Sequence, residues 1–161
     1  LRYRGYPIET LAQNCDFLET AYLLIFGELP TPAQAEEFRA GIRDHTMIHE
    51  DMKAFYNGFP REAHPMAILS SVVGALSTFY QDSLDVNDPD EVEISVYRLL
   101  AKLPTIAAYS YKKSMGQPFM YPLNSLNYCE NFLNMMFSTP ASDYEVDPDF
   151  VEALNLLLIV H

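Results

Sequence analysis

The side chains in this sequence best suited to metal binding or catalysis are four histidines and two cysteines. His45 and His49 are four residues apart, a spacing that can bind zinc from one helical face, but no third ligand lies nearby in the sequence. Cys15 and Cys129 have neither CxxC spacing nor a histidine at ligand spacing, which favours buried free thiols over a disulfide or a zinc site. We therefore predict no metal site in this chain.

The other two histidines lie at the ends of apolar runs. His64 directly precedes Pro65 and an uncharged stretch, where its ring can cap a helix N-terminus or serve a functional site. His161 follows the aliphatic run LLLIV, so its ring is either a satisfied group of the core or lies in a pocket. The residues alone leave both pairs of alternatives open.

Sequence motifs for common chemistries are absent: there is no Gly-rich phosphate loop and no nucleophile elbow. The acidic stretch QDSLDVNDPDEVE suggests a calcium site, but it lacks the glycine and the terminal glutamate of an EF-hand loop. Asp88, Pro89 and Glu91 instead predict a capping box at the start of a helix.

Composition limits the class of protein and its partners. The 161 residues are 49% hydrophobic, enough for one domain with a core. The net charge of −12 repels phosphate backbones and anionic bilayers, so we predict no nucleic acid and no membrane as a partner. No signal peptide is visible, and two unpaired cysteines fit a reducing compartment. Because the sequence starts at Leu1 and stops within the apolar pattern LNLLLIVH, we expect a fragment of a longer chain.

Helix start signals recur along the whole chain, whereas alternation of period two is absent. The sequence therefore predicts a nearly all-α fold with a short extended N-terminal piece around Gly5 and Pro7. Pro104 should kink or split the longest helix. The expected helices span 8–15, 16–26, 31–43, 49–56, 64–80, 91–115, 126–137 and 148–161.

The stretch HPMAILSSVVGALSTFY, residues 64–80, contains no Asp, Glu, Lys or Arg and predicts a helix buried on all sides. Ser70, Gly74 and Ser77 recur along it at three- to four-residue spacing, so one stripe has almost no side-chain bulk. A mid-helix glycine costs about 1 kcal/mol relative to alanine, which suggests close contact with another backbone. That contact lies either within the chain or across a symmetric interface.

Several stretches in order resemble citrate synthase, and more narrowly its larger bacterial type, which assembles as a hexamer. They are LRYRGYPIETLA, AYLLIFGELPT, HPMAILSSVVGALSTFY, LPTIAAYSYKKSMGQPF, NFLNMMFSTP and LLLIVH. The resemblance covers practically the whole chain and implies that residues 1–161 are part of the large helical domain, without the small domain and the catalytic remainder. It also implies a cytoplasmic bacterial enzyme that forms a dimer and a hexamer, a trimer of dimers.

The activity implied is condensation of acetyl-CoA with oxaloacetate to give citrate and CoA, with no cofactor. The family's catalytic Asp and two His residues fall outside these residues, so no catalytic residue is expected here. His161 corresponds to the first His of an active-site pair and is carried over as a substrate-pocket residue. Two alternatives remain: 2-methylcitrate synthase, which uses propionyl-CoA, and a non-catalytic helical assembly or effector-binding fragment.

The hexameric type also has an allosteric NADH site in this part of the chain. Two positions depart from the NADH-inhibited members: Asp44 replaces an Arg, and Ala141 replaces a Cys. We therefore expect a recognisable pocket that binds NADH weakly. The matching positions are His45, Thr46, Met47, Tyr80, Arg98, Lys102 and Asn124.

Overall fold

Helices make up nearly all of the regular structure in the computed structural model, which describes residues 1–161. The predicted all-α fold is confirmed, and the N-terminal extended piece is a two-stranded antiparallel hairpin of β1 (Arg2–Tyr3) and β2 (Tyr6–Pro7). None of the helices combines the length and the apolar character needed to cross a bilayer. The helices are α1 (Ile8–Asn14), α2 (Phe17–Phe26), α3 (Pro32–Arg43), α4 (Met52–Asn57), α5 (Pro65–Ala75), a 3₁₀ turn η1 (Leu76–Thr78), α6 (Pro89–Met115), α7 (Tyr128–Phe137) and α8 (Pro148–Val160).

Local side chains fix most helix starts where the sequence predicts them. Asp16 and Glu19 form a capping box at α2, with the Asp16 carboxylate accepting from the Glu19 N–H at 2.8 Å. Thr31 caps α3, and the His64 ring accepts from the Met66 N–H at the start of α5. The capping prediction for His64 is therefore confirmed.

The start of α4 differs from the prediction. The helix begins at Met52 and not at His49, because residues 49–52 form a turn in which the Met52 N–H donates to the His49 carbonyl. The His49 ring also accepts from the Asp51 N–H, a local bond that competes with helix formation.

The predicted capping box at α6 is half right. Asp88 does cap the helix, accepting from the Asp90 N–H at 2.9 Å. Glu91, however, accepts from the Asp85 N–H at 2.8 Å and so fastens the preceding loop instead of closing the box. Side chains of α6, including Ser95 and Arg98, thus hold the acidic loop.

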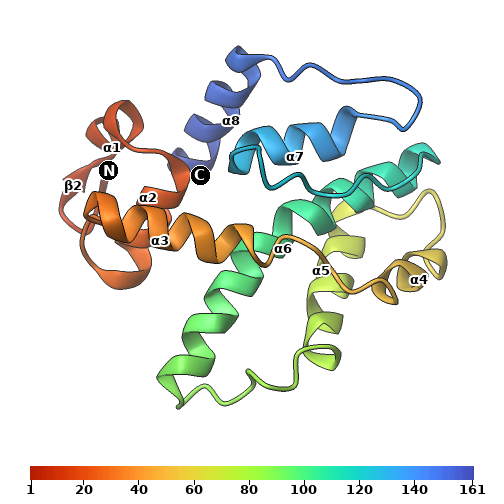
Figure 1. The fold of residues 1–161 in the computed structure, drawn as a ribbon, viewed down its shortest axis with the longest axis horizontal. Helices are drawn as coiled ribbons and strands as arrows, with labels where there is room; N and C mark the ends of the chain where they lie inside the picture. The colour runs from red at the N-terminus through yellow and green to blue at the C-terminus, as the bar shows by residue number, and fades with distance from the viewer.

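Pro104 does not split α6, which continues without a break from Pro89 to Met115. Pro104 has no N–H to donate to the Leu100 carbonyl, and the Tyr128 hydroxyl donates to that carbonyl at 3.0 Å. A side chain from α7 thus replaces the missing helical hydrogen bond. Figure 1 shows that α6 changes direction near its middle, as expected for a helix containing proline.

The long helix α6 lies at the centre of the molecule, with α3, α5 and α7 packed against it (Figure 1). Gly41 allows the close approach of α3, because a Cβ at that position would lie 2.7 Å from the Tyr97 ring of α6. The C-terminal helix α8 packs against α1, α2 and α7. The chain therefore ends beside its own N-terminal helices.

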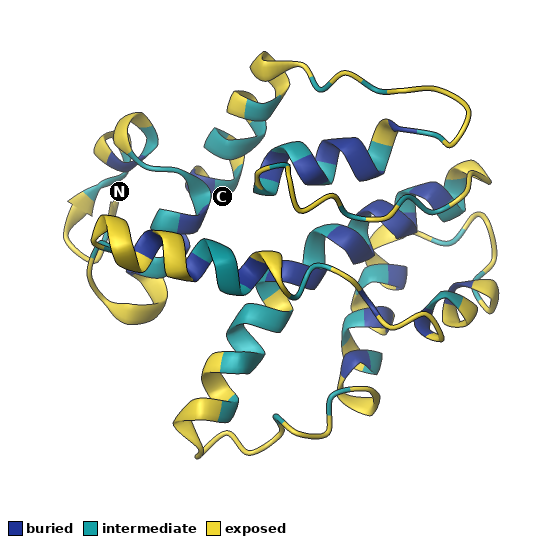
Figure 2. Ribbon diagram, in the orientation of Figure 1, coloured by how far each residue is buried: buried dark blue, intermediate teal, exposed yellow.

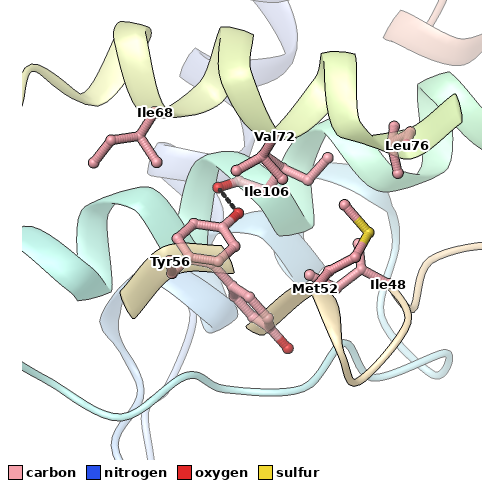
Figure 3. Close-up of a cluster of buried hydrophobic side chains, with 8 residues drawn as sticks. Ile48, Met52, Tyr56, Ile68, Val72, Leu76 and Ile106 are labelled. Carbon is pink, nitrogen blue, oxygen red and sulfur yellow. Dashed lines mark hydrogen bonds between the residues drawn. The ribbon is translucent and has the colours of Figure 1, made fainter. Parts of the chain in front are cut away.

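Buried apolar side chains gather in separate clusters, not in one continuous core. The largest joins α4, α5 and α6, and in it the Tyr56 hydroxyl donates to the Ile106 carbonyl at 3.2 Å (Figure 3). The second joins α2, α3 and α6 around Phe38, and the third joins α1, α2 and α8 around Ile159. Each end of the molecule thus has its own packing centre.

The prediction that residues 64–80 are buried on all sides is wrong for this chain. Ile68 and Val72 are the only buried residues of α5, whereas Ser70 and Gly74 are exposed (Figure 2). A Cβ added at Gly74 would meet nothing within 4 Å. No other part of this chain packs on Gly74. The predicted close contact within the chain is therefore absent, and the predicted contact across a symmetric interface remains.

Candidate functional site

The structure brings together all seven residues predicted to bind an effector. They come from the segment after α3, the loop after η1, the first half of α6 and the loop before α7. We call this set the cationic cluster: His45, Thr46, Met47, Tyr80, Arg98, Lys102 and Asn124.

Lys102 is the buried member of the cationic cluster. Its side chain is 2% exposed and donates to the carbonyls of His45 at 2.6 Å and Met47 at 2.7 Å. Burial, with a smaller contribution from the charge of Arg98, lowers the pKa of Lys102 to about 8. A buried cation without a carboxylate partner is thus held by backbone oxygens, and it fixes the segment between α3 and α4.

Arg98 lies one helical turn before Lys102 and is paired with an acid. Its guanidinium donates to both carboxylate oxygens of Asp82, at 2.8 and 2.9 Å, and to the Ser83 hydroxyl at 2.7 Å. This pairing raises the pKa of Arg98 and lowers the pKa of the Asp82 carboxyl. The Arg98 Nε is buried and makes no hydrogen bond, so one donor of the guanidinium is unsatisfied.

The ring of Tyr80 lies close to both cations. The ring centroid of Tyr80 is 4.7 Å from the Arg98 guanidinium carbon and 5.0 Å from the Lys102 Nζ. The negative face of the ring offsets part of the repulsion between the two positive charges. The structure thus tolerates two cations one turn apart that share one aromatic ring.

His45 offers an anion a donor only when it is protonated. Its Nδ1 lies 2.7 Å from the Gly41 carbonyl, which can only accept, so Nδ1 carries a hydrogen. The neutral ring therefore presents an unprotonated Nε2, and protonation converts it into a second donor. Both His45 and His49 use Nδ1 on backbone groups, and no group of three or more His, Cys, Asp or Glu side chains is placed to hold a metal ion.

Thr46 and Asn124 connect the cationic cluster to a cavity. The Thr46 hydroxyl donates to the Asn124 side-chain oxygen at 3.1 Å, and both residues line a cavity of about 620 Å³. Helices α2, α3, α6, α7 and α8 all contribute to its walls. The cluster is therefore continuous with a space large enough for a small molecule.

Two charged residues at this site carry no local sequence signal. Arg39 of α3 donates to Asp16 at 2.7 Å and Glu19 at 2.9 Å and lines the cavity. Asp82 was read only as part of an acidic loop, although it is the partner of Arg98. Both pairings join residues 16 or more positions apart, which a local pattern does not reveal.

His161 follows the last turn of α8 and lies beside α2 (Figure 1). Its backbone N–H donates to the Leu157 carbonyl, and its side chain is exposed. The ring is not part of a core formed by these 161 residues, and its role in a substrate pocket stays a prediction.

The two cysteines are free thiols, as predicted. Cys129 is buried, and burial raises its pKa to about 11. Cys15 is half-buried, and burial also raises its pKa. Both are therefore protonated at neutral pH and poor nucleophiles.

Known proteins of similar sequence and structure agree with one another. The family model for the C-terminal domain of citrate synthase matches residues 1–161. Citrate synthase 1 of Mycobacterium tuberculosis is 60% identical over all 161 residues, and the chain spans 37% of that relative. The crystal structure of citrate synthase from Pyrobaculum aerophilum matches 98% of this chain and 40% of its own, with a TM-score of 0.85 and 31% identity. That from Thermotoga maritima matches 98% of this chain and 38% of its own, with a TM-score of 0.78 and 28% identity.

Proposed function

This chain belongs to the citrate synthase family, and on that premise we propose that it is a segment of an enzyme that condenses acetyl-CoA with oxaloacetate to give citrate and CoA. The observation that carries the proposal is 60% identity to a citrate synthase over every residue of the chain. Because the chain spans 37% of that relative, the reaction is assigned to the longer protein and not to these residues alone. The proposed segment is part of the large helical domain.

His161 is the proposed contribution of this segment to the active site. Oxaloacetate carries two carboxylates and a keto oxygen, all of which accept hydrogen bonds from an imidazole N–H. An exposed ring at the end of α8 is free to make such a bond. The proposed role is substrate binding, and the groups that transfer protons lie outside this segment.

The relatives favour acetyl-CoA over propionyl-CoA, because those compared above are named citrate synthases. Assays of CoA release by the full-length protein, with each acyl-CoA and oxaloacetate, would test this choice. We expect turnover with acetyl-CoA and none with a polypeptide limited to residues 1–161. No citrate from the full-length protein would overturn the proposal, and turnover by the isolated segment would refute the placement of the catalytic groups.

The cationic cluster is proposed as the effector site for a dinucleotide such as NADH. Two closely spaced cations suit a pyrophosphate, and the adjoining cavity offers space for more of the ligand. Asp82 already neutralises Arg98, and the exposed Asp44 adds negative charge just before His45. The proposed binding of NADH is therefore weak.

The exposed face of α5 is proposed as part of a dimer interface in the full-length protein. Small side chains at Ser70 and Gly74 leave that face nearly flat, and nothing in this chain covers it. Gly74→Leu should leave the fold of this segment intact but shift the full-length protein to smaller species in sedimentation. A Ser71→Ala variant is the matched control on the neighbouring position, and an undisturbed oligomer in Gly74→Leu would refute the interface.

A further inference from the structure

A side chain of α8 completes the N-terminus of α2. The first N–H groups of a helix have no partner within it. At α2 the Asp16 carboxylate accepts from the Glu19 N–H, and the Phe17 N–H donates instead to the Asn155 Oδ1 at 2.8 Å. Asn155 and Phe17 are 138 positions apart, so this cap is a tertiary contact that fixes α8 relative to α2.

An apolar contact follows one turn later on the same face of α8. Ile159 is 1% exposed and packs with Leu11 of α1 and Leu23 of α2. Positions four apart lie on the same side of a helix, so Asn155 and Ile159 face the same neighbours. Ile159 stands two residues before His161.

The two contacts do different things. Apolar packing gives most of the free energy, but it is non-directional and tolerates small shifts of a helix along and about its axis. A hydrogen bond to a fixed N–H tolerates much less, because it weakens steeply with distance and angle. Asn155 therefore sets the register of the last two turns of α8, which end at His161.

We infer that Asn155 is a positioning residue for the oxaloacetate pocket: through the Phe17 N–H it fixes α8 so that His161 is held where the substrate binds. The inference rests on the proposed function. Asn155 does not touch the substrate, and it acts through the position of α8. Its loss should therefore weaken binding of oxaloacetate more than binding of acetyl-CoA.

The test compares Asn155→Leu, which removes the acceptor, with Asn155→Asp, which keeps an oxygen that a helix N-terminus favours. In the full-length enzyme we expect Asn155→Leu to raise the KM for oxaloacetate about five- to tenfold, since one lost hydrogen bond is worth roughly that factor in binding. The KM for acetyl-CoA should change less than twofold, and Asn155→Asp should stay near the wild type. Asn14→Leu is the matched control, because the Asn14 amide bonds only to Thr10 of its own helix.

An unchanged KM for oxaloacetate in folded Asn155→Leu, or the same rise in Asn155→Asp, would overturn the inference. A merely structural role would lower the melting temperature and the yield of active enzyme without moving this KM. Should Asn155→Leu not fold, Asn155→Ser is judged by the same criterion, since a small polar side chain suits a cavity wall. Hydrogen exchange of the peptide that begins α2 distinguishes failure of this inference from failure of the proposed function. Faster exchange in Asn155→Leu would show that Asn155 protects the Phe17 N–H, even if the wild type makes no citrate.

Discussion

The two halves of α6 each bury a lysine, and the two lysines differ in their neighbours. Lys102 lies in the first half, where most residues are exposed or half-buried, whereas Lys112 lies in the second half, where nearly all residues are buried or half-buried (Figure 2). Lys112 is 0% exposed and donates to the Ser138 carbonyl at 2.6 Å and the Gln117 side-chain oxygen at 2.8 Å. Burial lowers the pKa of both lysines.

The difference separates a structural cation from one that can serve a ligand. Lys112 joins the end of α6 to the end of α7, and its two partners are neutral acceptors within the chain. Lys102 also donates to carbonyls, but a second cation, Arg98, lies close to it. Two other members of the cationic cluster, Thr46 and Asn124, line a cavity. A cation kept beside a second cation raises the local positive potential, which costs stability and favours a bound anion.

Substituting each lysine by Met gives the largest effect and tests the comparison directly. Lys112→Met should lower the free energy of unfolding by about 2–4 kcal/mol, because it removes a charged donor from the buried Ser138 carbonyl and from the Gln117 side chain. Lys102→Met should cost less, because it also removes the repulsion with Arg98. Denaturant titration of the full-length protein measures both variants, and equal losses would contradict the proposed difference.

The next effect concerns binding at the cationic cluster. Asp44→Arg replaces an anion by a cation near the proposed pyrophosphate site, removing a repulsion and adding an attraction of about 1 kcal/mol each. We expect NADH to inhibit this variant some thirtyfold more strongly than the wild type, which should be inhibited weakly or not at all. Glu28→Arg, with the same charge change on an exposed loop after α2, is the control.

Inhibition curves for the three proteins decide between two readings of the cluster. Strong inhibition of the wild type, or no gain in Asp44→Arg, would mean that Asp44 does not face the ligand. The cations would then serve mainly to bind the protein's own carboxylates, as Arg98 binds Asp82.

Local patterns predicted the parts of the fold that depend on neighbours in the sequence. The helices expected from residues 16, 31, 64 and 148 begin at or one residue after those positions, because the caps Asp16, Thr31, His64 and Asp147 each bond to an N–H two or three residues ahead. The continuity of α6 was not predictable in this way, because the group that replaces the lost hydrogen bond comes from Tyr128, 28 residues away.

In the candidate sites too, contacts between residues far apart in the sequence were not predicted. The members of the cationic cluster came from a family resemblance, and only the structure shows that Arg98 is already paired with Asp82. Asn155 carried no signal at all, because its partner Phe17 is at the other end of the chain. Contacts between residues far apart in the sequence depend on how whole helices pack, and local sequence patterns do not predict them.

The junction between the two halves of α6 can be tested at Tyr128. Tyr128→Phe keeps the ring but leaves the Leu100 carbonyl without its donor, which should cost about 1–2 kcal/mol of unfolding free energy. Tyr121→Phe is a matched control, because the Tyr121 hydroxyl bonds only to the exposed-surface groups of Glu50 and Lys53. A Tyr128→Phe variant as stable as the control would mean that the Leu100 carbonyl finds another donor.

The smallest effect is the pH dependence of Lys102. Its pKa is about 8 in the folded chain against an ordinary 10.5, so the ammonium is lost as pH rises through about 8, whereas Arg98 stays charged. Nucleotide binding at the cationic cluster should therefore weaken a few-fold between pH 7 and pH 9. Between about pH 8 and 10.5 the unfolded chain holds a proton that the folded chain has released, so this group makes the stability rise with pH. Calorimetric titration of Asp44→Arg with NADH at several pH values measures the binding, and Lys102→Gln in the same background should bind weakly at every pH. A wild-type-like decline of affinity in the Lys102→Gln protein would assign the pH dependence to a different group.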